Sequence, residues 1–288
     1  MISDVAFAGS PELEQNALRA LFKVYLDIAG ISEIKLKIFL RTDIWKNITS
    51  SGFREASHIT RELTLSWDRA ALLQLVTQRL VQNPQLVHFY DVTPADVLSS
   101  TDAQQWTFDR IYPEQVEGGP NKPKTFDWCM TRTRDGSGAT APRELIHLLS
   151  ETRNVQLRRL EVGEPTPGGE KLFERNSLKE ALPAVSDTRL TRTLYAEYPN
   201  MRHYVQRLEG QKTNHSAGSL AVIWEIPEDA AKSVALELVD IGFFERRGNL
   251  ANPLFWVPFL YRPALQLVQG TAEGVLYTAE QPQSQEDE

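Results

Sequence analysis

An apolar run that ends abruptly at an arginine constrains the fold of this chain more than any other feature. The run Ile34–Leu40 reads IKLKIFL, and its β-branched and aromatic residues predict a buried strand. Arg41 follows at the point where that strand leaves the sheet, and Asp43 comes two residues later. Because ligands of open α/β sheets bind at this edge, Arg41 is a candidate for contact with a phosphate. The alternative is that Arg41 forms a salt bridge with Asp43.

The neighbouring segments predict part of an α/β core over residues 1–67. A helix is expected from Pro11 to Ala29, because its apolar residues recur at spacings of three and four. Glu62–Trp67, which reads ELTLSW, alternates like a second strand. One helix and two strands cannot form a complete parallel sheet, so other strands must flank them.

Residues 68–162 predict a helical domain. Pro142 suits the first position of a helix, and Arg143 falls in its first turn. Positive charge is unfavourable at that end of the helix dipole, so Arg143 is a candidate for facing an anion. The expected helices are Arg69–Val81, Asp102–Ile111, Thr125–Thr133 and Pro142–Leu160.

The turn-rich segment GEPTPGG, Gly163–Gly169, predicts a domain boundary. A connector over 170–213 is expected to hold three short helices, and a compact domain is expected over 214–269. In that domain a helix, Glu228–Ile241, precedes two strands, Phe243–Arg247 and Phe255–Tyr261, which is the winged-helix pattern. Residues 270–288 are polar and acidic, and we expect them to be a disordered tail.

The composition limits the possible partners. A formal net charge of -7 gives no overall attraction to nucleic acid or to an anionic membrane. The basic cluster near the expected wing, Arg246, Arg247 and Arg262, is the candidate nucleic-acid contact, but the acidic helix before it makes nucleic acid an unexpected partner. The single cysteine fits a reducing cytoplasm, and neither a signal peptide nor a membrane span is expected.

Two short motifs, in this order and spacing, carry a resemblance to a known family. They are Phe39-Leu40-Arg41-Thr42-Asp43 and Thr140-Ala141-Pro142-Arg143-Glu144-Leu145. With the expected winged helix, they resemble the C-terminal half of bacterial STAND-type P-loop ATPases, which are relatives of AAA+ and NB-ARC proteins. The resemblance covers nearly all of the chain up to Gln269.

The resemblance implies a fold and a set of nucleotide contacts. It implies a partial P-loop core, followed by a mostly α-helical lid and a winged helix. Arg41 would take the sensor-1 role, with Asp43 in the same segment. Arg143 would take the sensor-2 role, and Pro142 would approach the base.

The chain departs from that family in one respect. None of its 16 glycines belongs to a G-x-x-x-x-G-K-[ST] loop, and no strand ending in paired acids precedes the first helix. We therefore expect a truncated gene product or one half of a split protein, which on its own neither binds ATP tightly nor hydrolyses it. ATP or ADP with Mg²⁺ is expected only in a complete core. The expected partner is the missing P-loop half or another protein chain, and a homo-oligomer is possible.

The residues alone leave two other functions to consider. One is a winged-helix module that binds nucleic acid or protein without nucleotide. The other is an independent hydrolase, which the motifs do not favour: there is no G-x-S-x-G, and the histidines have no metal-binding spacing. No catalytic residue and no metal site are expected. The histidines are His58, His88, His147, His203 and His215.

Overall fold

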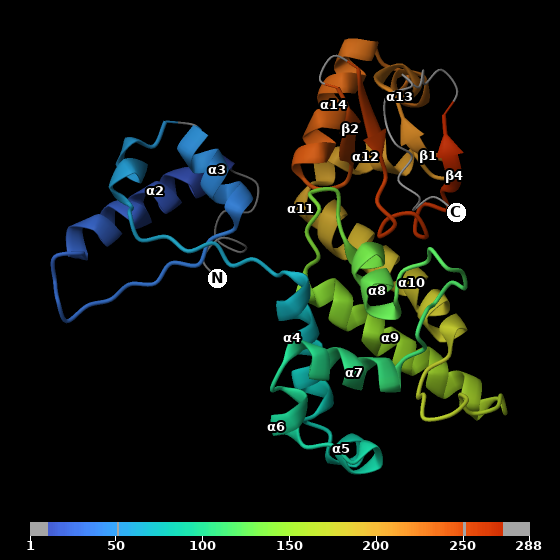
Figure 1. The fold of residues 1–288 in the computed structure, drawn as a ribbon. Helices are drawn as coiled ribbons and strands as arrows, with labels where there is room; N and C mark the ends of the chain where they lie inside the picture. The colour runs from blue at the N-terminus through green and yellow to red at the C-terminus, as the bar shows by residue number, and fades with distance from the viewer. Residues whose placement is uncertain (1–10, 51, 250–251, 273–288) are drawn as a thin grey trace. The chain divides into compact units, whose positions relative to one another are not determined.

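The structure, a computed structural model, describes residues 11–50, 52–249 and 252–272. The chain divides into two compact units, Met1–Ser66 and Trp67–Glu288, and each is described here by itself (Figure 1). The described part is mostly helical, with one small sheet of four strands near the C-terminus.

The N-terminal unit is built from two helices and a short turn around a very small core. Phe22 of the first helix packs against the ring of Trp45, with 5.0 Å between ring centroids. Among the described residues of this unit, only Phe22, Ile48 and Phe53 are buried apolar side chains. The elements are α2 (Pro11–Ile28), α3 (Thr42–Ser50) and the 3-10 turn η1 (Arg54–His58).

The prediction of two strands in this unit is wrong. Ile34–Leu40 and Glu62–Trp67 lie in no strand, and α3 begins directly after Arg41. A strand needs hydrogen-bonding neighbours, and no described residue supplies them to either segment. The predicted α/β core is therefore absent from the described structure, whereas the predicted helix from Pro11 is confirmed with its end at Ile28.

The first part of the C-terminal unit is helical, as predicted. The four expected helices are confirmed to within a residue or two at their ends, and two short helices, α5 and α6, were missed. Asp68 caps α4, because its carboxylate accepts a hydrogen bond from the Ala71 amide at 2.8 Å. The helices are α4 (Arg69–Leu80), α5 (Pro84–Tyr90), α6 (Pro94–Val97), α7 (Thr101–Ile111), α8 (Thr125–Thr133) and α9 (Pro142–Glu161).

A long helix, α10 (Arg175–Arg189), packs along α9. The sequence predicts separate helices at Ser177–Leu182 and Ala184–Tyr198, and this prediction is wrong at Pro183, because α10 continues through that residue. The apolar side chains on its buried face, Leu178, Ala181 and Val185, favour continuation despite the missing amide. After α10 come a π-helical turn, η2 (Leu190–Leu194), then α11 (Tyr195–Glu197), η3 (Pro199–Met201) and α12 (Arg202–Gln206).

Two helices and four strands complete the described chain. The strand order is β2-β3-β1-β4; β1 pairs antiparallel with β3 and parallel with β4, and β2 with β3 forms an antiparallel hairpin. The predicted helix and hairpin are confirmed with shifted ends, whereas β1 and β4 were missed. The elements are β1 (Lys212–His215), α13 (Ala217–Trp224), α14 (Glu228–Asp240), β2 (Glu245–Gly248), β3 (Pro253–Trp256) and β4 (Val268–Thr271).

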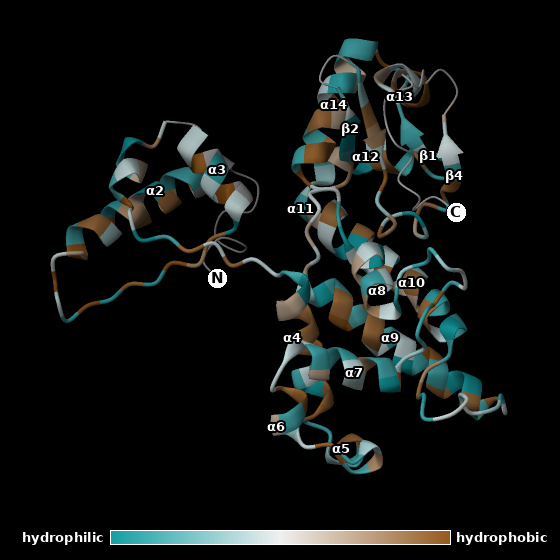
Figure 2. Cartoon of the chain, in the orientation of Figure 1, coloured by the Kyte–Doolittle hydropathy of each residue, from teal (hydrophilic) through white to brown (hydrophobic). Residues whose placement is uncertain are grey.

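One apolar core runs through the C-terminal unit, from α4 to the turns after β3. Figure 2 shows brown, apolar stretches along the helices that face it. Its aromatic centre includes Phe108, whose ring stacks on Tyr112 at 4.3 Å and meets Phe126 edge-on at 5.2 Å. No helix within the described ranges is long and apolar enough to cross a membrane. The finer domain boundaries at 162, 170 and 213 stay predictions, and most of the expected tail, 273–288, lies outside the described residues.

Candidate functional site

The start of α9 is formed as the sequence predicts. Pro142 occupies the first turn and Arg143 follows it. Ala141 precedes the helix, and no described side chain caps its first backbone amides. Open amides at a helix N-terminus favour an anion. The start of α9 can therefore present the Arg143 side chain and backbone N–H groups that no described side chain caps to an anion.

Arg143 is largely exposed but already has partners inside the protein. Its Nε and Nη2 lie 3.1 and 3.0 Å from Glu144 Oε1, and Nη2 also donates to Thr193 Oγ1 at 3.2 Å. The Arg143 side chain is 66% exposed, whereas that of Glu144 is 5% exposed. The guanidinium can therefore turn towards solvent, while the carboxylate stays fixed in the interior.

The same carboxylate oxygen binds a second arginine, Arg189 at the end of α10. Arg189 Nη1 lies 3.2 Å from Glu144 Oε1, Nη2 lies 3.4 Å from Asp135 Oδ2, and Nε donates to Tyr261 Oη at 3.3 Å. We call these four residues, Asp135, Glu144, Arg189 and Tyr261, the arginine clasp. It joins α9, α10 and the loop before α9 to the segment after β3.

The electrostatics of the clasp favour a charged Arg189 and a protonated Tyr261 at neutral pH. Burial opposes the charge of Arg189, but the Tyr261 hydroxyl and the two carboxylates raise its pKa above the usual value. Burial raises the pKa of Tyr261 to about 12, although Arg189 opposes this. Glu144 Oε2 is also buried and makes no hydrogen bond to any residue that the structure describes. One oxygen of Glu144 thus serves two arginines.

A close backbone contact lies beside the clasp. The Gly136 amide donates to the Gly242 carbonyl at 2.7 Å. A Cβ atom at Gly136 would lie 2.3 Å from the carbonyl oxygen of Phe244. The loop before α9 is thus pressed against the turn between α14 and β2.

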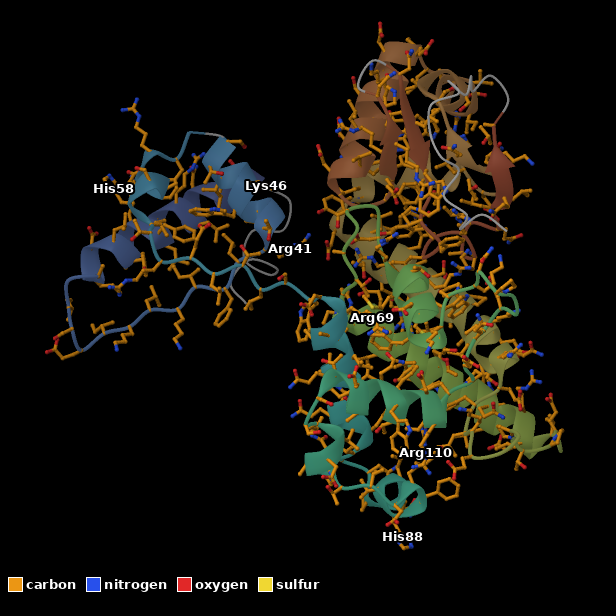
Figure 3. The ribbon with its side chains drawn as sticks, viewed as in Figure 1. Arg41, Lys46, His58, Arg69, His88 and Arg110 are labelled. Carbon is orange, nitrogen blue, oxygen red and sulfur yellow. The ribbon has the colours of Figure 1, made fainter. Side chains whose placement is uncertain are left out.

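The other predicted nucleotide contacts belong to the N-terminal unit. Arg41 is exposed and lies immediately before α3, where its carbonyl accepts a hydrogen bond from the Trp45 amide at 3.0 Å (Figure 3). Asp43 lies in the first turn of α3, and its side chain is outside the described structure. The predicted strand that would carry Arg41 to a sheet edge is absent. The proposed pairing of Arg41 with Asp43 stays untested.

The three arginines predicted for nucleic-acid contact have different environments. Arg246 is exposed on β2. Arg247 stacks over the Trp256 ring at 3.8 Å and donates from Nε to Glu245 Oε1 at 2.8 Å. Arg262 is buried, lies over the rings of Trp256 and Phe259, and donates to the Val257 carbonyl at 2.9 Å. Two of the three therefore take part in packing.

Nothing in the described ranges adds a catalytic or metal site. No group of three histidine, cysteine or acidic side chains there is arranged to hold a metal ion. Cys129 is fully buried, which raises the pKa of its thiol and makes it a poor nucleophile. His215 is also buried, and its pKa is lowered to about 4 by desolvation.

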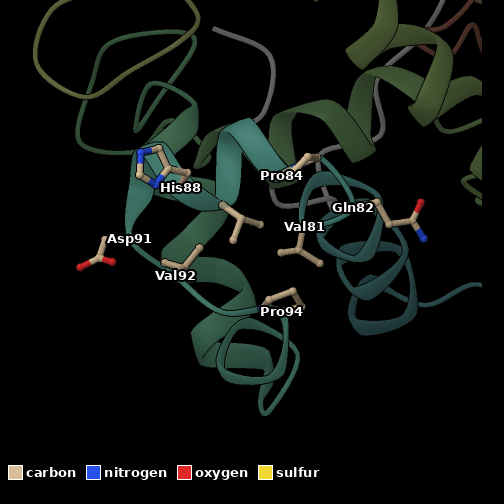
Figure 4. A pocket seen from close by; sticks show the side chains of 8 residues that line it. Val81, Gln82, Pro84, His88, Asp91, Val92 and Pro94 are labelled. Atoms are coloured by element: carbon tan, nitrogen blue, oxygen red, sulfur yellow. The ribbon is translucent and has the colours of Figure 1, made fainter.

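A surface hollow in the C-terminal unit is lined by none of the candidate residues. It has a volume of about 420 Å³, and Val81, Pro84, His88 and Asp91 are among its lining side chains (Figure 4). It is open and lined mostly by valine and proline, so it offers few polar groups to orient a ligand.

Sequence reasoning identified Arg143 but missed the clasp behind it. The clasp contacts join residues 45, 54 and 72 positions apart in the chain. No local spacing signals such contacts. The only hint was the acidic residue that follows Arg143 in the motif.

Comparisons with protein-family models, with curated proteins and with solved structures found no match to this chain.

Proposed function

We propose that this chain is the sensor, lid and winged-helix portion of a nucleotide-dependent molecular switch of the STAND type. On its own it is not competent for ATP hydrolysis, because it has no phosphate-binding glycine loop in its sequence. The order of its motifs supports the proposal, as does the helix that starts at Pro142 with Arg143 in its first turn.

We further propose that the last part of the chain is a winged helix. The element order β1-α13-α14-β2-β3 supports this assignment, with α14 in the position of the recognition helix and the β2–β3 hairpin as the wing. The pairing of β1 with β3 brings the strand before the helices beside the wing. The additional strand β4 extends this sheet on the other edge.

The observation that carries the functional proposal is the shared carboxylate of Glu144. Arg143, the residue that can reach solvent, and Arg189, the residue that contacts Tyr261, bind the same oxygen atom. A change at one arginine therefore alters the partners of the other. This gives a physical route from the start of α9 to the segment after β3.

The chain's own residues would act as follows. When Arg143 turns towards a phosphate, Glu144 loses one of its two cations and binds Arg189 alone. The guanidinium of Arg189 then shifts towards Glu144 and away from Asp135 or Tyr261, which changes how the loop before α9 is held. Because only one arrangement lets Arg143 reach the phosphate, nucleotide favours that arrangement by population shift. Arg41, Asp43 and Pro142 remain proposed contacts to the same nucleotide.

A titration with a fluorescent ATP analogue and Mg²⁺ tests the proposal. The chain alone should not bind it tightly, whereas a complex of the chain with a P-loop polypeptide should. The polypeptide to use is the one encoded directly upstream of the Met1 codon, either fused in frame or co-expressed. Failure of both samples to bind would rule out the assignment.

The alternative, a winged-helix module that works without nucleotide, gains some support from the surface of α14. That helix carries Glu228, Asp229, Glu237 and Asp240, and the neighbouring arginines are mostly engaged in packing. These features favour a protein partner over nucleic acid. Salt-dependent retention on duplex DNA, lost in an Arg246→Ala, Arg247→Ala double variant, would instead establish nucleic-acid binding.

A further inference from the structure

Two extended segments of the N-terminal unit have the side-chain pattern of strands but pair with no strand among the described residues. Between 35 and 40, and again between 62 and 66, no backbone amide donates to another residue that the structure describes. Both segments are drawn as extended traces without arrows in Figure 1. Open N–H and C=O groups along an extended chain are a template for another strand.

These segments also expose large apolar side chains. Phe39 is 82% exposed, Leu63 84% and Leu65 70%. Single exposed apolar residues are ordinary, but Leu63 and Leu65 alternate along a segment whose amides donate to no described residue, and Phe39 lies in the other such segment. The feature is therefore a pair of open strand edges and not scattered surface residues.

The described residues of the unit form a very small core. They bury only three apolar side chains, although Ile38 and Leu40 pack against that cluster. One face of the first segment is thus already covered by the unit's own helices. No described residue pairs with its backbone edges, and a core this small leaves room for a second chain to supply the pairing.

The chain between the two segments defines the geometry of a sheet that would contain both. Residues 41–59 include α3 and η1, and a crossover of a dozen or more residues containing a helix is what parallel strands require. Two adjacent antiparallel strands would need only a short turn. The segments are therefore suited to a parallel sheet, which needs further strands and cover on both faces.

The charge pattern indicates the chemistry of the neighbouring strand. Lys35 and Lys37 alternate with the apolar residues, so in a strand they point to the face opposite Ile34 and Leu36. Side chains on the same face of adjacent strands lie within about 5.5 Å, where opposite charges are favourable. A strand with acidic residues on that face complements this edge.

We propose that residues 34–40 and 62–66, which form no strand in the described structure, become strands of a parallel sheet when a second polypeptide completes it, an α/β protein whose neighbouring strand presents acidic side chains to Lys35 and Lys37. This inference deepens the proposed function, because such a polypeptide would also be the one to carry the phosphate-binding loop. It depends on the N-terminal unit, however, and not on Arg143 or the clasp.

Hydrogen exchange of the chain purified with its native partners tests the proposal. The chain, tagged after Glu288, is isolated without nucleotide from the cells that make it and compared with the same chain purified alone from a foreign host. Amides of 35–40 and 62–66 should exchange at least about 100-fold more slowly in the native sample. Equal exchange rates in the two samples would overturn the proposal.

Variants show whether strand pairing causes the protection. Lys37→Pro with Thr64→Pro removes two backbone amides that donate to no described residue, so folding of the chain is expected to be retained while protection and the partner are lost. Thr166→Pro, in an exposed loop of the other unit, is the matched control and should leave both unchanged. Lys35→Glu with Lys37→Glu keeps the backbone intact and should also weaken the complex.

The outcomes separate this inference from the proposed function. Protection by a second copy of this chain, recognised from the mass of the complex, would overturn the proposal of an α/β partner. A protected complex that fails to bind the ATP analogue would support the strand pairing and refute the nucleotide switch. Nucleotide binding without protection of either segment would support the nucleotide switch and refute the strand pairing.

Discussion

At Gly136 the loop before α9 meets the backbone of Phe244 so closely that a methyl group has no room. The nearest atom is a carbonyl oxygen, which cannot move aside like the end of a flexible side chain. We expect Gly136→Ala to lower the free energy of unfolding of the C-terminal unit by about 1–3 kcal/mol, measured by urea denaturation.

The matched control for that substitution is Gly168→Ala. Nothing lies within 4 Å of the added Cβ at this position, and its φ is not positive. The change should stay within about 0.5 kcal/mol. Equal effects of the two substitutions would mean that the contact between Gly136 and Phe244 is not tight.

His215 gives the C-terminal unit a pH dependence with a definite sign. Burial lowers its pKa to about 4, although the hydrogen bond from Nε2 to the Lys212 carbonyl opposes this. In the unfolded chain histidine titrates near 6.5, so between these values the unfolded state binds a proton that the folded state does not. The stability is complete above pH 6.5 and falls by about 1 kcal/mol per unit as the pH drops towards 4.

His215→Gln isolates that contribution from the carboxylates, which also titrate at acidic pH. The variant is expected to be less stable at pH 7, since it alters a buried hydrogen bond, but to have a flatter dependence on pH between 4.5 and 6.5. The free energy of unfolding of both proteins across this range is the measurement. Parallel curves would show that His215 is accessible to protons in the folded state.

At the scale of elements, the arginine clasp should hold α9, α10 and the C-terminal segment together. Glu144→Gln removes the charge that two arginines share at a position where the side chain is only 5% exposed. The substitution leaves the buried Arg189 with Asp135 alone as a counter-charge in the clasp, so a loss of about 3 kcal/mol in the free energy of unfolding is expected.

Glu225→Gln is the same chemical change at an exposed pair and serves as the control. The Glu225 side chain is 76% exposed and lies 3.1 Å from Arg207 Nη2. Exposed pairs contribute less than about 1 kcal/mol. A Glu144→Gln variant as stable as Glu225→Gln would show that the clasp does not stabilise the fold.

The helices could be predicted from sequence because their signals are local. The apolar spacing of α4 and α8 and the Asp68 cap of α4 depend on residues within a few turns, and both helices form where expected. The predicted break at Pro183 is wrong, because burial of the apolar face of α10 stabilises the helix by more than the loss of one backbone amide costs. Local sequence was therefore enough to predict α4 and α8, whereas the continuation of α10 through Pro183 depends on packing against other parts of the fold.

Strands and the clasp could not be predicted because their signals are not local. Ile34–Leu40 has a strand sequence without described neighbours, whereas the polar strand β1, KTNH, forms because β3 and β4 flank it. The candidate residue Arg143 followed from a motif. Its connection through Glu144 to Arg189 did not, since it is made by side chains 45 positions apart.

At the scale of the whole molecule, the boundary between the two units should be open to proteases. Arg61 is exposed in an extended segment whose amides make no described hydrogen bond, whereas the Arg189 side chain is only 15% exposed. Brief trypsin digestion of the chain alone should therefore cut after Arg61 and leave a fragment from Glu62 that stays folded. A fragment first cut after Arg189, identified by mass, would contradict the division into two units.

In the proposed switch, Arg143 contacts a phosphate of the bound nucleotide. The most direct test of this contact is the affinity of the complex, this chain with the P-loop polypeptide, for a fluorescent ATP analogue before and after Arg143→Ala. Loss of a charged contact to phosphate should weaken binding of ATP about tenfold or more, with a smaller effect on ADP. Unchanged affinity for both nucleotides would contradict the account.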